Sequence, residues 1–414
     1  MTLLAMRIKM PATEFEIRSA DRLSEENSAE IRQPKKKNNR KNKRMKTPVK
    51  VLAVVMSVVA VLGGLYAFVV YSNIPFIKYW RTIWIETAMT TKSHTWLAEY
   101  FFPKDMIDEV MSAQQPLADV IGGEEHLIGV DKNEHTDPIW GDGTKYPTTS
   151  PAVDDILGQK YLVVGEKDYA GNTVIINDIE EGIVVSEIVG NGYRGEIMLV
   201  DDPSRVFLGM TQYPGDTGMR ILDMMDHYGA VAAVNASGFQ DPDENGNGGE
   251  VVGMSVSEGQ YWGSYARYYS SMVLTTEDKL VVGNIQNWNS YGNIRDGIQF
   301  SPVLIANGEK LVNESSGYGI QPRTAIGQRD DGVIVFIVID GRDPLNGILG
   351  CTVGDLADEL LKYDVINASS CDGGATTALA YEDRLLNNNC SWNPEIGRLL
   401  PNAFMVRSKA DAED

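Results

Sequence analysis

Short runs of β-branched and aliphatic residues recur between turn signals from about Lys160 onward. Runs of this length and composition are typical of strands, and their close spacing predicts hairpins in a meander. The first runs are residues 161–165, 173–178, 182–190, 196–202 and 205–210. Further strands are predicted for VVGMSVS, MVLTT, KLVVG and VIVFIVID.

Two segments show helical spacing of apolar residues instead. Residues 218–228 form one, and residues 352–363 the other, which begins at a Thr352 N-cap. Between the two helices, residues 230–239 predict a buried strand that ends in a loop of small residues. Strands mixed with a few helices predict an α+β domain with mixed or antiparallel sheets and a few flanking helices.

Near the N-terminus, Val51–Tyr71 is an uncharged apolar run. Its 21 residues reach roughly 30 Å as a helix, about the hydrocarbon thickness of a bilayer. The run is too long for a signal-peptide core, no small-residue cleavage site follows, and apolar residues on all sides argue against a buried core helix. We expect one transmembrane helix over residues 49–71.

The basic stretch KKKNNRKNKRMK directly precedes this helix. Basic residues that flank a span stay cytoplasmic, so residues 1–48 are predicted to be a cytoplasmic tail and the rest to be extracytoplasmic. The expected location is the cell membrane, crossed once. The first 34 residues are expected to be disordered or weakly helical.

Residues 72–120 are predicted to form a helical juxtamembrane stalk. Residues 75–102 are rich in Trp, Tyr and Phe, which favours a helix at the membrane interface, although a helix packed on the outer domain fits equally well. The Gly-, Pro- and Asp-rich residues 121–155 predict an irregular lead-in to the outer domain, which we place at 121–414.

The charge is divided as unevenly as the hydrophobicity. Residues 1–50 hold 14 Lys/Arg and 6 Asp/Glu, whereas the remaining residues hold 23 and 51. A net charge of −28 beyond residue 50 repels phosphate backbones, so nucleic acid is excluded as a partner of the outer domain.

Metal ligands are not apparent. The three cysteines, Cys351, Cys371 and Cys390, can form at most one disulfide, and they are expected to be small buried side chains. The segment DPDENGNGG (241–249) begins like an EF-hand loop but has Val252 at position 12, which leaves a surface turn or a different cation site. No cofactor is predicted, and a divalent cation stays open.

Four segments place polar groups at strand ends or in glycine-rich turns. Glycines let backbone N–H groups approach anionic oxygens, arginines clamp phosphate, and carboxylates supply acid/base chemistry. The segments are AVAAVNASGF with Asn235, QPRTAIG with Arg323 and Thr324, VIVFIVIDGRDP with Asp340 and Arg342, and INASSCDGGATTALAY with Asp372, Gly373, Gly374 and Thr376.

In this order the segments resemble the phosphodiester glycosidase domain, a family known from the lysosomal uncovering enzyme and from bacterial proteins tied to exopolysaccharide. The resemblance spans roughly residues 155–408 and includes the strand–turn–strand at 301–311, Asp-Gly-Arg, Asp-Gly-Gly and a closing Pro-Asn-Ala-Phe-Met-Val. It implies hydrolysis of a sugar 1-phosphodiester to the free sugar and a phosphomonoester. This chain has Ala375 where the family commonly has glycine, and Asn-Ala-Ser-Gly-Phe for Asn-Gly-Gly-Phe.

We therefore expect a membrane-anchored hydrolase of glycosyl phosphodiesters in cell-surface polysaccharide or exopolysaccharide metabolism. Arg323 and Arg342 are expected to hold the phosphate, and Asp372 and Asp340 to be the catalytic carboxylates. Asn235, Thr324, Gly373, Gly374 and Thr376 are expected to bind substrate oxygens. The alternatives are a non-catalytic envelope module that binds polysaccharide or a partner protein through the same cleft, and a structural scaffold assembled through residues 75–102.

Overall fold

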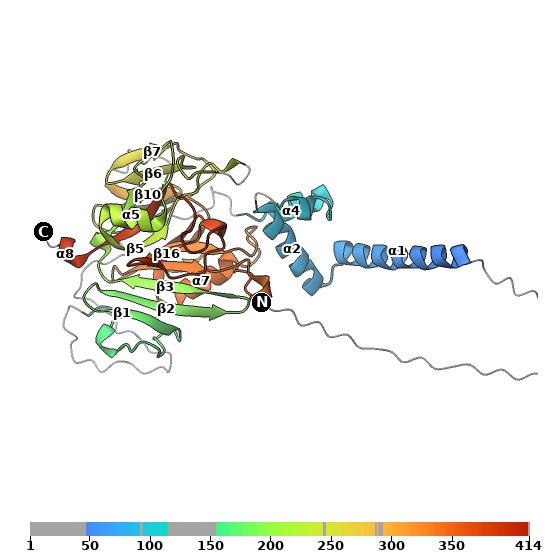
Figure 1. Ribbon diagram of the computed structural model, residues 1–414, viewed down its shortest axis with the longest axis horizontal. Coiled ribbons are helices and arrows are strands. Elements are labelled where there is room, and N and C mark those ends of the chain that lie inside the picture. The colour runs from blue at the N-terminus through green and yellow to red at the C-terminus, as the bar shows by residue number, and fades with distance from the viewer. Residues whose placement is uncertain are drawn as a thin grey trace, which may run out of the picture. The chain divides into compact units, whose positions relative to one another are not determined.

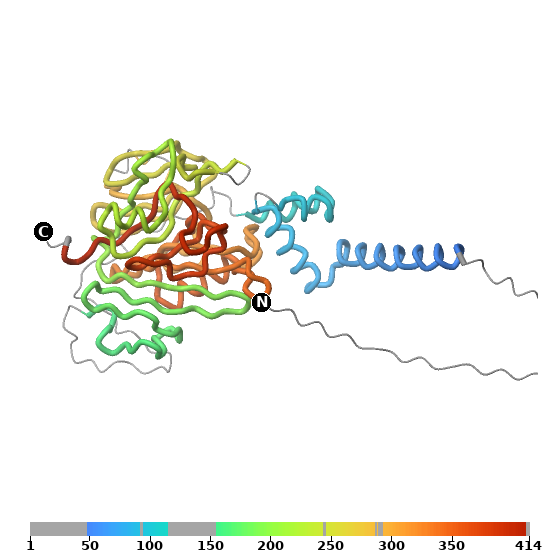
Figure 2. The backbone as a smooth tube through the Cα atoms, in the orientation of Figure 1, coloured from blue at the N-terminus to red at the C-terminus, as the bar shows by residue number. Residues whose placement is uncertain are grey.

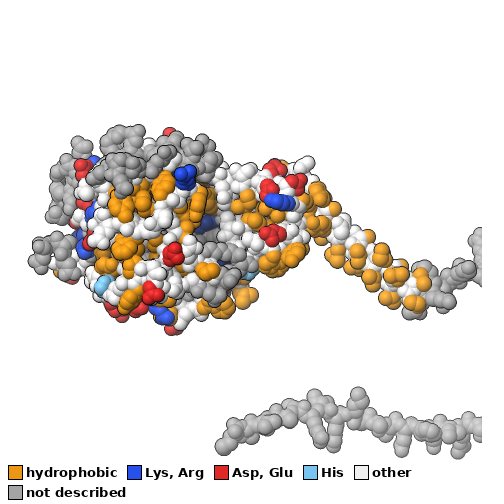
Figure 3. All heavy atoms as spheres, turned by 90° about the horizontal axis from the view of Figure 1, so that it is seen from above, with side chains coloured by type: hydrophobic (Ala, Val, Ile, Leu, Met, Phe, Trp, Pro, Cys, Tyr) orange, Lys and Arg blue, Asp and Glu red, His pale blue; other side chains and the backbone are white. Residues whose placement is uncertain are grey.

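The computed structural model describes residues 47–91, 94–114, 155–242, 246–285, 288 and 293–412. The chain divides into two units between residues 62 and 63. The first helix, α1 (Thr47–Tyr71), is the one element in the described residues that is long and apolar enough to cross a membrane, with a mean hydropathy of 2.5. Its hydrophobic side chains lie on the surface (Figure 3).

Three short helices follow: α2 (Pro75–Met89), α3 (Trp96–Glu99) and α4 (Lys104–Met111). Pro75 begins α2, where its missing N–H costs no hydrogen bond. The helices share a small apolar core that includes Ile85, Ala98 and Ile107. Phe76, Trp80 and Trp84 stay exposed on α2, whereas its C-terminal end contacts the following domain, as detailed below.

The domain contains three antiparallel sheets (Figure 1). The largest has the order β1 (Thr173–Asp178), β2 (Ile183–Gly190), β3 (Tyr193–Val200), β14 (Ile334–Ile339), β13 (Arg323–Arg329), β15 (Val365–Cys371), β11 (Val303–Ala306), β12 (Glu309–Lys310). The second has the order β7 (Gln260–Gly263), β6 (Met254–Ser257), β10 (Ile294–Gln299), β8 (Ser271–Thr275), β9 (Leu280–Gly283). The third has the order β17 (Arg384–Leu385), β16 (Leu379–Tyr381), β5 (Ala230–Asn235), β18 (Asn402–Arg407), β4 (Val206–Met210).

One apolar core lies among the three sheets and takes side chains from each of them, such as Phe336, Met272 and Phe404. Figure 2 shows the last part of the chain running through the middle of the domain, where β18 lies between β5 and β4. Alternate residues of a strand point to opposite faces, so β14 also contributes Val335, Ile337 and Ile339 to a second core on the other face.

Two helices cover outer faces of these sheets. The helix α7 (Val353–Leu361) packs on the large sheet, and α5 (Ile221–Tyr228) packs on the third sheet. Thr352 caps α7, because its hydroxyl accepts the Asp355 N–H while the Asp355 carboxylate accepts the Thr352 N–H. A short C-terminal helix, α8 (Lys409–Ala412), follows β18.

The fold class and the membrane-length helix before the domain are confirmed. The predicted strand at 161–165 is wrong. A 3-10 turn, Gln159–Tyr161, leads into it, and Gly165 has φ +92, which breaks an extended backbone. Leu162 packs against the second core, but Val163 and Val164 are more than half exposed, so only one residue of the apolar run is held by a core. The predictions for residues 1–34 and for most of 121–155 lie outside the described residues.

Candidate active site

The Asn235 side chain connects the ends of three strands. It is the last residue of β5 and is fully buried. Its Oδ1 accepts the Thr324 hydroxyl (2.8 Å) and the Ala378 N–H (3.0 Å), while its Nδ2 donates to the Asp372 carbonyl (2.7 Å). The Asp372 N–H in turn donates to the Ala236 carbonyl (2.9 Å). Three of the predicted site residues therefore belong to one hydrogen-bonded cluster.

The loop after β15 carries Asp372 on a backbone that only glycine allows. A side chain at Gly373 would come within 2.6 Å of the Pro322 carbonyl, which accepts the Gly374 N–H at 2.9 Å. Gly374 has φ +67, and a side chain there would meet the Arg342 guanidinium at 3.0 Å. The Asp372 carboxylate accepts the Thr376 hydroxyl at 2.9 Å. Ala375 lies outside the left-handed region, so the loop needs no glycine at that position.

The two predicted phosphate-binding arginines have different surroundings. Arg342 is exposed and has φ +59, an uncommon conformation for a residue with a side chain, and strained backbone of this kind clusters at functional sites. Its guanidinium donates to the Gln321 side-chain oxygen (3.0 Å). Arg323 instead donates to three backbone carbonyls, those of Tyr318 and Gly319 at 2.6 Å and that of Cys351 at 3.3 Å. Burial lowers the pKa of Arg323, and the charge of Arg342 adds to that shift.

Asp340 lies at the end of β14 and is 1% exposed. Its carboxylate contacts Arg194 Nε (3.3 Å) and Asn387 Nδ2 (3.3 Å), and the same Asn387 amide donates to the Thr377 carbonyl of the Asp372 loop. Burial raises the pKa of Asp340, against the lowering effects of Asn387 and Arg194. Asp340 is thus a buried carboxyl joined to the site through Asn387, whereas Asp372 is partly exposed.

A third buried carboxyl, Glu196, was not among the residues predicted from the sequence. It lies on β3 opposite Val338 and is 8% exposed, with one oxygen that has no hydrogen-bond partner among the described residues. Burial raises its pKa well above the usual range, and the nearby Asp340 charge adds to the shift. The signal was present in the run EIMLVDD, because Glu196 falls on the same strand face as the core residues Met198 and Val200.

Aromatic residues from distant loops also lie near this cluster. The rings of Tyr269 and Phe300 are 5.4 Å apart, and Phe300 is the side chain nearest to Gly238 after β5. Burial raises the pKa of Tyr269 to about 12, with a further contribution from the Asp372 charge. Aromatic lining is usual in pockets for organic ligands. No periodicity in the sequence could have connected residues so far apart.

The EF-hand-like segment is fixed by an ion pair at its first carboxylate. The Asp241 carboxylate accepts hydrogen bonds from both terminal nitrogens of the Arg398 guanidinium, at 2.9 and 3.0 Å. It also accepts the Gly246 N–H at 2.6 Å. Asp243 and Asn245 lie outside the described residues. Within the described ranges, no cluster of three His, Cys, Asp or Glu could hold a metal ion. All three cysteines are free, and Cys351 and Cys371 are buried.

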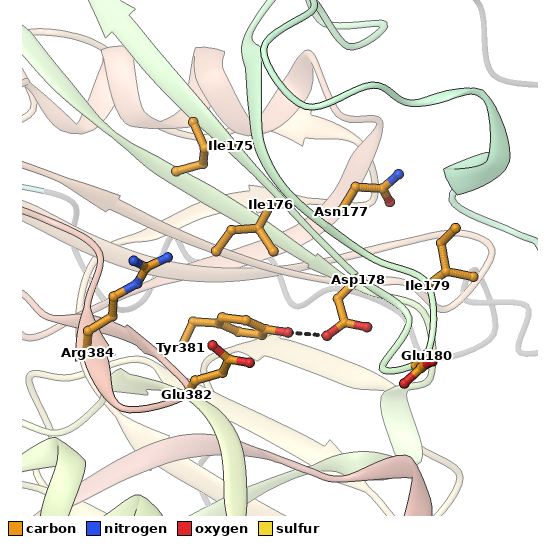
Figure 4. Close-up of a pocket in the computed structure, with 9 residues that line it drawn as sticks. All are labelled: Ile175, Ile176, Asn177, Asp178, Ile179, Glu180, Tyr381, Glu382 and Arg384. Carbon is orange, nitrogen blue, oxygen red and sulfur yellow. Dashed lines mark hydrogen bonds between the residues drawn. The ribbon is translucent and has the colours of Figure 1, made fainter.

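A hollow of about 470 Å³ lies elsewhere, between β1 and the β16–β17 hairpin. Asp178, Glu180, Tyr381, Glu382 and Arg384 contribute to its lining. Figure 4 shows the Tyr381 hydroxyl pointing at the Asp178 carboxylate, to which it donates a hydrogen bond. None of the predicted site residues lines this hollow.

Residues 228–407 match the model of the phosphodiester glycosidase family. The matched residues include Asn235, the two arginines, Asp340 and the Asp372 loop. The resemblance noted in the sequence is therefore confirmed for this part of the chain.

Individual relatives are more distant. An uncharacterized SPbeta prophage-derived protein of Bacillus subtilis (strain 168), YomE, is 28% identical over 206 residues, which are 45% of this chain and 29% of that protein. The chain thus matches under a third of the Bacillus protein. The zebrafish N-acetylglucosamine-1-phosphodiester alpha-N-acetylglucosaminidase catalytic domain, auto-inhibited by its pro-peptide, is 18% identical with a TM-score of 0.45, covering 55% of this chain and 82% of that one. A hypothetical Synechocystis protein is 16% identical with a TM-score of 0.41, covering 58% and 65%.

Proposed function

We propose that this protein is a membrane-anchored hydrolase of glycosyl phosphodiesters whose phosphodiester glycosidase domain lies outside the cytoplasm. The observation that carries the proposal is the Asn235 cluster, which brings Thr324 and the Asp372 loop together in a family-matched domain. The basic tail before α1 supports the orientation, since it favours a cytoplasmic N-terminus. The substrate class is a sugar 1-phosphodiester of cell-surface polysaccharide or exopolysaccharide.

Asp372 is the carboxylate that we assign to the reaction. Its side chain is partly exposed and oriented by Thr376, whereas Asp340 is almost fully buried and occupied by Arg194 and Asn387. Hydrolysis breaks the bond between the anomeric carbon and the phosphate oxygen. Asp372 either takes the proton of the attacking water or attacks the anomeric carbon itself, and the anomeric configuration of the released sugar distinguishes the two routes.

Arg342 is assigned to the phosphate. The phosphodiester is already anionic when it binds, and a guanidinium donates forked hydrogen bonds to its oxygens. Arg342 is exposed beside the Asp372 loop, so it can reach a ligand, whereas Arg323 already donates to three carbonyls. Arg323 and Asp340 are assigned no contact with substrate. Arg323 positions the loop before β13, and Asp340 positions Asn387.

The test compares Asp372→Asn with wild-type full-length chain in detergent micelles, on a nucleotide-sugar and a GlcNAc-1-phosphodiester. Loss of a group that acts as base or nucleophile lowers kcat by about 10²–10⁴-fold. Asp178→Asn, in the hollow of Figure 4, is the matched control and should keep kcat within about two-fold of wild type. Full activity of Asp372→Asn would overturn the assignment.

The same experiment tests the non-catalytic alternative. Saturable binding of the phosphodiester without turnover, by a wild-type chain that melts cooperatively, would identify a binding module and reject the hydrolase. Turnover that Asp372→Asn abolishes rejects the binding module.

A further inference from the structure

The C-terminal end of α2 lies directly against the loop 317–321, which precedes β13. The Glu86 carboxylate accepts the Gly317 N–H (3.1 Å), and the Thr87 hydroxyl accepts the Ile320 N–H (2.9 Å). A side chain at Gly319 would come within 2.4 Å of the Thr87 backbone, so only glycine allows this approach. The helix that follows the apolar span after three residues is therefore packed on the domain.

The other side of this loop is held by Arg323. Its guanidinium donates to the carbonyls of Tyr318 and Gly319, as described above. Glu86 is fully buried, and burial raises its pKa while the Gly317 and Gly319 N–H groups and the Arg323 charge lower it. The loop thus lies between a helix carboxylate and a site arginine, and both bind it through its backbone.

Gln321 connects α2 to the other site arginine. Its Nε2 donates to the Thr91 hydroxyl (2.9 Å) and to the Thr87 carbonyl (3.1 Å), and its Oε1 accepts Arg342 at 3.0 Å. A guanidinium can only donate and a carbonyl can only accept, so these partners allow one orientation of the amide. The Gln321 backbone is fixed by paired hydrogen bonds with Cys351, both at 3.1 Å.

We propose that the juxtamembrane helix α2 is part of the substrate site, because it positions the Arg342 guanidinium through Gln321. Gln321 and Thr91 are positioning residues, since neither is assigned a contact with substrate. The inference rests on the proposed function for the role of Arg342. In this proposal α2 has a role besides following the membrane-length helix, because it sets the affinity of Arg342 for phosphate.

The test uses full-length chain and two variants. Thr91→Val removes the hydroxyl that accepts the Gln321 amide at nearly constant side-chain volume, and Gln321→Leu removes the whole connection. Thr82→Val, in α2 and without a hydrogen bond to loop 317–321 in the described residues, is the matched control; Thr91 lies two residues beyond the end of the same helix. One hydrogen bond corresponds to about a 3–10-fold change in KM, which we expect for Thr91→Val, with a larger change for Gln321→Leu. For both variants kcat should stay within about two-fold of wild type.

A double-mutant cycle separates positioning from general damage to the fold. In an Arg342→Ala background, Thr91→Val and Gln321→Leu should change KM no further, since the group they position is gone. Three outcomes would overturn the proposal. They are effects on KM that persist in the Arg342→Ala background, a fall in kcat as large as the rise in KM, and an unchanged KM for both variants.

Inorganic phosphate gives a readout that needs no turnover. Its dissociation constant, measured by calorimetry, should rise 3–10-fold in Thr91→Val and stay constant in Thr82→Val. If wild type binds phosphate in this way but hydrolyses no glycosyl phosphodiester, the proposed function fails and the positioning role stands. If wild type is active and Thr91→Val binds phosphate normally, the positioning role fails and the proposed function stands.

Discussion

Two regions of this domain differ in how their polar groups are held. In the hollow beside β1, side chains of two hairpins surround an open space, and Asp178 and Tyr381 pair with each other across it. In the Asn235 cluster, the ends of β5, β13 and β15 are joined by hydrogen bonds of one buried side chain, that of Asn235, to the Thr324 hydroxyl and to two backbone groups. Catalysis depends on groups fixed before the substrate arrives. We therefore favour the Asn235 cluster over the hollow as the candidate active site, because its polar groups are held in place by hydrogen bonds.

The largest expected effect is on the cluster itself. Asn235→Ala leaves the Thr324 hydroxyl, the Ala378 N–H and the Asp372 carbonyl without their buried partner, each at a cost of about 1–3 kcal/mol. We expect a loss of at least about 3 kcal/mol, or a fall in Tm of roughly 6–12 °C. Thermal unfolding followed by circular dichroism measures it. Glu382→Gln at the exposed rim of the hollow should change stability by less than about 0.5 kcal/mol, and equal effects of the two variants would remove the distinction.

A second prediction concerns the buried carboxyls behind the site. The pKa of Glu196 is raised well above its usual range by burial, so the folded state binds this proton more tightly than the unfolded state. Wild-type stability should therefore fall as the pH rises from about 4.3, the unfolded value, towards the raised folded value. Glu196→Gln cannot lose a proton, so its Tm relative to wild type should increase with pH over this window. A difference in Tm that is constant from pH 4.5 to 8 would show that Glu196 is charged.

The smallest effect is expected in the hollow. Tyr381→Phe removes the hydrogen bond to Asp178, for which we expect about 1 kcal/mol of lost stability and no change in kcat or KM. Denaturant unfolding and the phosphodiester assay together measure this. A change in KM comparable to that of Thr91→Val would mean that the hollow takes part in substrate binding after all.

The sequence located Asp340 because the pattern that predicts a strand also predicts its end, and the apolar run before it is β14. Asp372 was located by the two glycines that follow it, since the residues before it, VINASSC, are largely polar and yet form β15. Both strands are neighbours of β13 in one sheet. The strand predicted at 161–165 failed for a related reason. Its composition was apolar, but no core lay within reach of Val163 and Val164. Apolar composition indicates a strand only where a partner and a core exist.

Glu196 and Gln321 were missed for different reasons. Glu196 was visible as one acidic residue on the inward face of a predicted strand, but its neighbour Asp340 directly follows β14, 144 residues later in the sequence. Gln321 is the first residue of QPRTAIG, and nothing local in the sequence distinguishes it. Its importance comes from Thr91 and Arg342, which approach it from two different elements.

By itself, the sequence determined the membrane-length helix, the α+β class, the resemblance of residues 228–407 to the phosphodiester glycosidase family, and the loops that carry the polar groups. Each of these depends on local composition, periodicity or motif order, which a linear chain records. Only the tertiary structure decided that the Arg323 guanidinium donates to backbone carbonyls while Arg342 stays exposed. It also decided that α2 packs against loop 317–321, which contacts both arginine side chains. These facts depend on which atoms meet across long separations in the chain, and hydrogen bonds act only over about 3 Å.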